Sequence, residues 1–120
     1  MTIPSTNEPE ILRAQSEVVS TARDILSGAV GIVEGARRLT KLGHALGVDS
    51  APDFTFFVGL DSETDHLPVA EVRRNWAEDA LRRTDEELRA CESFYRDRTF
   101  RVCQSLIHLD AQTSLPPVIL

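Results

Sequence analysis

Two ladders of apolar residues, each with a step of seven, constrain the fold of this 120-residue chain more than any other feature. The first ladder consists of Ile11, Val18, Ile25, Ile32, Leu39 and Leu46. The second consists of Leu81, Leu88, Tyr95, Val102 and Leu109. Because a step of seven residues returns to the same side of an α-helix after two turns, each ladder predicts a long helix with one buried seam. The sequence therefore predicts an all-α, bundle-like fold of two long antiparallel helices.

The first predicted helix spans about residues 8–46, and its glycines make its continuity the main question. Gly28, Gly31 and Gly35 each cost about 1 kcal/mol relative to alanine inside a helix, which favours a break near residue 28. The seven-residue phase nevertheless passes through all three, and a row of small residues lies beside the ladder. This row consists of Ala22, Ala29, Ala36 and Gly43. We expect one long, kinked helix that is capped by Gly47, with the break as the alternative.

The segment between the two helices, residues 47–68, is expected to be an irregular crossover. Its apolar stretch, residues 53–58, is too short to predict a strand, and we expect it to pack on the helices. The polar run 61–66 is expected to form a loop. Residues 69–74 are expected to form a short helical turn.

The second predicted helix spans about residues 76–109, with Asn75 as its N-cap and Glu78 completing a capping box. Its surface carries acid-before-base pairs four residues apart, each worth about 0.2–0.5 kcal/mol when exposed. These pairs are Glu78–Arg82, Asp79–Arg83, Asp85–Arg89, Glu92–Arg96 and Asp97–Arg101. Such a face is typical of a solvated helix surface. We expect a single helical domain over residues 1–120, with irregular tails at 1–7 and 111–120.

Composition limits the partners of the chain. Apolar residues at 42% and charged residues at 27% are ordinary for a globular protein, and the formal net charge is −6. This acidic balance disfavours binding to nucleic acid or to an anionic membrane surface. No apolar run approaches the roughly 20 residues of a membrane span, and no signal peptide is evident. We therefore expect a cytoplasmic, bacterial-type protein without a cofactor.

The two cysteines are expected to be reduced. If Cys91 and Cys103 both lie on the second helix, they are separated by about 18 Å at 1.5 Å per residue. A disulfide needs Cα atoms within roughly 7 Å, so these residues cannot pair within that helix. Two thiols packed as small apolar side chains are the expected outcome.

The run 61–66 is the only segment with a concentration of chemically active groups. The EF-hand spacing is absent there, and neither HxxxH nor HExxH spacing accompanies the histidines, so we predict no metal site and no catalytic residues. The side chains can cap turns, or they can contact a ligand or partner. The candidate binding residues are Asp61, Ser62, Glu63, Asp65, His66, Arg37 and Arg74. A fork between Arg37 or Arg74 and Asp65 is expected to pin the crossover.

Three stretches resemble a small family of uncharacterised bacterial domains. They are the runs GIVEGARRL at 31–39, FVGLDSETDHLP at 57–68 and RNW at 74–76. The resemblance covers roughly residues 20–108, and the run SETDHLP is its most specific part. It implies a bacterial cytosolic setting and assigns no activity, substrate or cofactor.

These observations leave three classes of function open. The first is a protein–protein interaction module, because a small acidic protein suits a basic partner. A core made of only two helices also suggests a homodimer. The second is a small-ligand or metal-binding protein that uses the segment 61–66. The third, an enzyme, would need a pocket with perturbed titrating groups, and the sequence identifies none.

Overall fold

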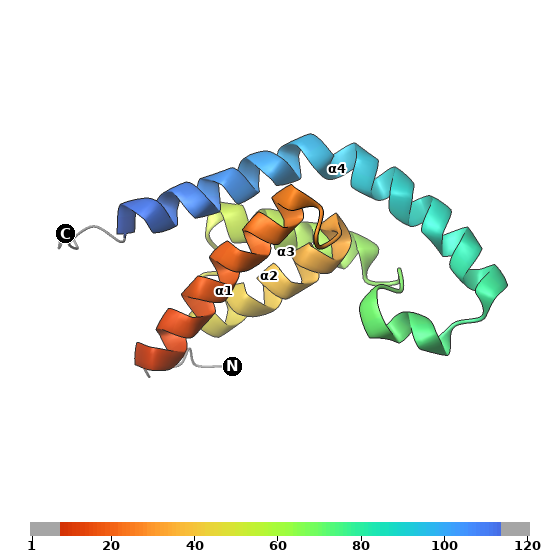
Figure 1. The fold of residues 1–120 in the computed structure, drawn as a ribbon, viewed down its shortest axis with the longest axis horizontal. Coiled ribbons are helices and arrows are strands. Elements are labelled where there is room, and N and C mark those ends of the chain that lie inside the picture. The colour runs from red at the N-terminus through yellow and green to blue at the C-terminus, as the bar shows by residue number, and fades with distance from the viewer. Residues whose placement is uncertain (1–7, 114–120) are drawn as a thin grey trace.

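The computed structural model describes residues 8–113, and this part of the chain contains helices and no strands (Figure 1). The elements in chain order are α1 (Glu8–Ser27), α2 (Ile32–Leu46), α3 (Pro52–Thr64), the 3-10 helix η1 (Ala70–Asn75) and α4 (Glu78–Thr113). The all-α prediction is confirmed, but the prediction of two long helices is wrong, because residues 8–113 contain four α-helices. The expected tails at 1–7 and 114–120 lie outside the described residues, and residues 111–113 belong to α4.

The first predicted helix is broken at Gly28, so the alternative prediction is correct. Gly28 has φ +83°, a left-handed conformation that glycine adopts without steric cost. The amide of Gly28 donates to the carbonyl of Ile25 at 3.2 Å, and the amide of Val30 donates to the carbonyl of Asp24 at 3.1 Å. These bonds satisfy carbonyls at the end of α1 that would otherwise lack partners.

The seven-residue apolar pattern continues across this break because both helices face the same core. Ile25, at the end of α1, and Ile32, at the start of α2, belong to one cluster of buried side chains. A ladder that continues in phase therefore indicates a shared core and does not require a continuous helix. Gly47 caps α2 as expected, with φ +71° and its amide 3.1 Å from the carbonyl of His44.

The crossover prediction is wrong for residues 52–64, which form α3. Pro52 occupies the start of this helix, where its missing amide hydrogen costs nothing. Phe54, Phe57 and Leu60 are buried, with the spacing of three that places side chains on one helix face. The apolar stretch is therefore a core helix.

Residues 70–75 form η1, close to the expected turn, but the predicted capping box is wrong. Asn75 is the last residue of η1, and α4 begins three residues later at Glu78. The amide of Leu81 donates to the carbonyl of Ala77 at 3.0 Å, which starts the hydrogen bonding of α4. The first half of α4 and η1 extend beyond the three shorter helices in Figure 1.

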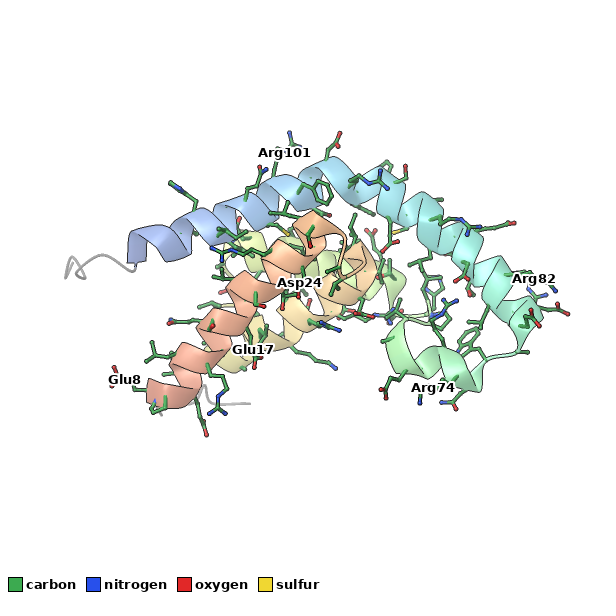
Figure 2. All side chains as sticks on the ribbon, in the orientation of Figure 1. Glu8, Glu17, Asp24, Arg74, Arg82 and Arg101 are labelled. Atoms are coloured by element: carbon green, nitrogen blue, oxygen red, sulfur yellow. The ribbon has the colours of Figure 1, made fainter. Side chains whose placement is uncertain are left out.

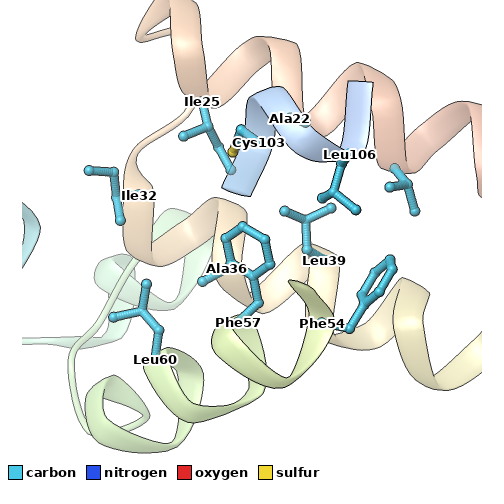
Figure 3. Close-up of a cluster of buried hydrophobic side chains, with 11 residues drawn as sticks. Ala22, Ile25, Ile32, Ala36, Leu39, Phe54, Phe57, Leu60, Cys103 and Leu106 are labelled. Carbon is cyan, nitrogen blue, oxygen red and sulfur yellow. The ribbon is translucent and has the colours of Figure 1, made fainter. Parts of the chain in front are cut away.

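The core lies where α1, α2 and α3 meet the second half of α4 (Figure 3). Two glycines allow close approach there. An added Cβ at Gly43 would lie 2.6 Å from Phe54 Cδ1, and one at Gly35 would overlap the side chain of Ile25. The buried apolar residues of the cluster are Val18, Ala22, Ile25, Ile32, Ala36, Leu39, Phe54, Phe57, Leu60, Cys103 and Leu106.

The second apolar ladder does not form the buried seam of α4, contrary to prediction. Tyr95 and Val102 pack against the edge of the core, and Leu109 is 48% exposed. The buried residues of α4, among those whose side chains are described, are Thr99, Cys103 and Leu106. The described segment 69–98 contains no buried residue. We call this segment the arm.

Candidate functional site

The predicted polar loop is mainly the end of a helix. Asp61, Ser62 and Glu63 lie in the last turn of α3, and Asp65 and His66 follow it. Helix ends present carbonyl groups without intrahelical partners and carry partial negative charge. The end of α3 therefore requires hydrogen-bond donors.

Arg37 on α2 supplies these donors. Its Nη2 donates to the carbonyl of Thr64 and, at 2.7 Å, to that of Leu67, while its Nε lies 3.3 Å from Asp61 Oδ1. One guanidinium thus holds the end of α3 against α2. The predicted fork to Asp65 is wrong: Arg37 pairs with Asp61, and the Asp65 side chain is 78% exposed.

The remaining polar residues of this segment face α4. His66 Nε2 lies 2.8 Å from Glu87 Oε1, and His66 Nδ1 lies 4.0 Å from Asp65 Oδ1. The Tyr95 hydroxyl donates to Glu63 Oε2, and this hydrogen bond raises the pKa of Tyr95 because the carboxylate favours the protonated phenol. The segment therefore connects α3 to α4 at two points.

Arg73, and not Arg74, makes the bidentate ion pair in this region. Arg73 Nη1 and Nη2 lie 2.6 and 2.9 Å from the two carboxylate oxygens of Asp85 on α4. This pairing lowers the pKa of Asp85 and raises that of Arg73. Arg74 lies on the outer side of η1, at the edge of the molecule (Figure 2). The sequence could not separate the two neighbouring arginines, because the geometry of η1 decides which one faces α4.

The predicted site residues do not converge on one point. Asp61 pairs with α2, while Glu63 and His66 contact different positions of α4. Within residues 8–113, no three His, Cys, Asp or Glu side chains are placed to hold a metal ion. The segment 61–66 therefore acts as a connector between helices, and its use for a small ligand or metal remains an untested prediction.

Sequence reasoning missed a cluster of aromatic side chains to which α3 and α4 both contribute. The Phe94 and Tyr95 rings meet edge to face with centroids 4.8 Å apart, and Phe56 lies 6.3 Å from Tyr95. Arg98 Cζ lies 4.9 Å from the centroid of Phe56, a cation–π distance. Phe94 is 80% exposed, more than any other large apolar side chain described. We call Phe56, Phe94, Tyr95 and Arg98 the aromatic surface.

A signal for this surface exists in the sequence. Phe94 precedes the ladder residue Tyr95, so the helix turns it about 100° away from the ladder and toward the charged face. The sequence thus places one large apolar side chain on a helix face that is otherwise charged. The contacts of Phe56 and Arg98 depend on the crossing of α3 and α4, which the sequence did not predict.

Both cysteines are free, as predicted, and both lie on α4. Burial raises the pKa of the Cys103 thiol to about 12, so the thiolate is almost absent at neutral pH. The pKa of Cys91 is also raised, first by burial and then by the nearby carboxylates of Glu63, Glu92 and Glu87. Neither thiol has the environment of a reactive nucleophile.

No helix in the described part of the chain combines the length and the apolar character needed to span a membrane. A scan of protein-family models and searches of curated proteins and solved structures find no match to this chain. The resemblance to uncharacterised bacterial domains therefore remains a prediction.

Proposed function

We propose that this protein acts as a protein–protein interaction module and that the aromatic surface is its contact region. The observation that carries the proposal is the 80% exposure of Phe94 beside Tyr95 and Arg98. Aromatic and arginine side chains dominate the binding energy of protein interfaces. An aromatic side chain buries a large area at an interface and has few rotamers to lose on binding, and arginine adds both hydrogen bonds and stacking.

The construction of the arm supports the same proposal. Over residues 69–98 it has no buried side chain, and it carries three of the six exposed large apolar residues among those described: Val72 at 54%, Trp76 at 38% and Phe94 at 80%. Polar contacts such as Arg73–Asp85 and His66–Glu87 hold it in place. A segment without its own core gains most from the burial that a partner would supply.

The proposed setting is the bacterial cytoplasm. The two free thiols suit a reducing compartment, and the acidic net charge of −6 suits a partner with a basic surface. The Glu63, Glu87 and Glu92 carboxylates close to Cys91 supply negative charge next to the aromatic surface.

The test is capture of partners from a host lysate by the wild type and by Phe94→Ser. Leu12→Ser is the matched control, because Leu12 is 57% exposed and lies on α1, away from the aromatic surface. Circular dichroism and melting temperature establish that all three proteins are folded. We expect one protein to be retained by the wild type and by Leu12→Ser and lost from Phe94→Ser. Identical retention by all three would contradict the proposed contact region.

A further inference from the structure

We propose that the outer face of α4 pairs with the same face of a second copy of this chain, antiparallel and with Phe94 at the two-fold axis. This inference rests on the proposed binding role of the aromatic surface and adds a second copy of this chain as an occupant that competes with a host protein for Phe94. It depends on the order of charges along the helix on either side of Phe94.

The outer face of α4 has opposite charges at equal distances from Phe94. Glu87 lies seven residues before Phe94 and Arg101 seven residues after it. Seven residues correspond to about 10 Å and to two turns, so all three side chains share one face of the helix. Each is exposed, and Figure 2 shows Arg101 on the outer side of α4.

A two-fold axis at Phe94 converts this order into self-complementarity. In an antiparallel pair centred there, Glu87 of each copy faces Arg101 of the other, which gives two intermolecular ion pairs. Ala90 lies opposite Arg98, so a short side chain meets a long one. An isologous interface requires this kind of self-complementary surface, and complementary charges fix the register of two helices.

The existing contacts of these residues are compatible with the pairing. His66 contacts Oε1 of Glu87, and a carboxylate accepts several hydrogen bonds at once, so the same group can also accept from Arg101. The Glu87 side chain is 56% exposed. Figure 1 shows that α4 bends over the three shorter helices with its convex side outward, so a second helix can lie close to it over only a few turns.

The size of the contact predicts a dimer that depends on concentration. One pair of helices buries less surface than the standard interface of about 1,600 Å². Two Phe94 side chains meeting at the centre supply its apolar part, and the ion pairs lie at its edges. We expect the average mass to rise from one chain of 13.3 kDa toward twice that value as concentration increases.

Charge reversal tests this register with the full-length chain in sedimentation equilibrium. We expect Glu87→Arg and Arg101→Glu each to raise the dimer dissociation constant about tenfold, because each dimer then contains two repulsive pairs. An equimolar mixture of the two variants should regain the wild-type dissociation constant, since both pairs are attractive in the mixed dimer. Melting temperatures of the variants show whether each remains folded.

Three results would overturn the inference. They are a wild-type protein that stays at the mass of one chain at every soluble concentration, a dimer that Phe94→Ser leaves unchanged, and a mixture that associates no better than its components. A single-chain wild type that still retains a host protein through Phe94 would overturn this inference and leave the proposed function standing. A Phe94-dependent dimer that captures no host protein would support the inference and count against the proposed function.

Discussion

Replacing Gly43 with alanine tests whether the core depends on close contact between α2 and α3. In an unconstrained helix interior this substitution stabilises by about 1 kcal/mol, because glycine is the poorer helix former. Here the added Cβ would lie 2.6 Å from Phe54 Cδ1 and 3.1 Å from Phe54 Cγ. Carbon atoms pack at about 3.5–4.0 Å, so the Phe54 ring must move by nearly 1 Å. Phe54 is only 7% exposed and has little free space to move into.

Overpacking of this kind costs about 1–3 kcal/mol, which exceeds the gain in helix propensity. The net of the two terms is a decrease in the free energy of unfolding of up to about 2 kcal/mol, or in the melting temperature of up to about 8 °C for a chain of this size. Urea unfolding followed by circular dichroism measures the change. Gly59→Ala is the matched control, because its Cβ would meet no atom within 4 Å and it also lies inside a helix. That variant should be more stable by up to about 1 kcal/mol.

A double-mutant cycle with Phe54→Ala isolates the contact. Phe54→Ala alone should cost about 3–5 kcal/mol because it leaves a cavity. In that background Gly43→Ala should be neutral or stabilising, so the two changes should couple by at least about 1 kcal/mol. If Gly43→Ala stabilised the wild type, or had the same effect in both backgrounds, the close contact would not be the reason for glycine at this position.

Three further predictions concern polar groups of α4. Glu92 Oε2 accepts a hydrogen bond of 3.0 Å from the Val33 amide at the start of α2, so Glu92→Ala should lower stability by about 1 kcal/mol and Glu92→Gln by less, measured by urea unfolding. Arg73 lowers the folded-state pKa of Asp85 below its ordinary value of 3.8. The stabilisation from this pair is therefore present above pH 3.8 and is lost as the pH falls through the folded-state pKa. We expect the difference in melting temperature between the wild type and Asp85→Asn to disappear in acid. The raised pKa of Cys103, about 12, predicts that mass spectrometry after alkylation finds Cys103 unmodified in the native protein and modified in urea.

The helical class could be predicted from the sequence because a seven-residue ladder is incompatible with strands. The break at Gly28 could not be resolved by the same signal, since Ile25 and Ile32 face one core whether or not the helix continues. The second ladder was misleading for a different reason. Leu81 and Leu88 lie on the arm, where no other helix covers α4 completely. Of the three buried residues of α4 whose side chains are described, Thr99 and Cys103 are only weakly apolar.

For the polar contacts, the sequence predicted the types of residue that interact, but in most cases not which residues pair. Arginine and carboxylate side chains do hold the segment after α3, but Arg37 pairs with Asp61, and the bidentate ion pair forms between Arg73 and Asp85. Three of the five predicted pairs along α4 illustrate the limit: Asp85 bonds to η1, Glu92 bonds to α2 and Asp79 bonds to Arg82 three residues on. Spacing along one helix predicts which charges are neighbours, whereas contacts between helices depend on crossings that the sequence does not specify.

The division of the chain between an apolar core and a polar arm bears directly on the proposed function. The ion pairs that hold the arm are screened by salt, and the Arg73–Asp85 pair is also lost in acid, whereas apolar burial in the core involves no titrating group. Residues 69–98 contribute no buried side chain to the core, although Cys91 and Tyr95 of this segment pack against it as partly buried side chains. Phe94 lies near the junction of the two parts, on the same helix as the buried Cys103. A partner bound there would contact a helix that is buried in the core along its second half and held by the polar contacts His66–Glu87 and Arg73–Asp85 along its first half.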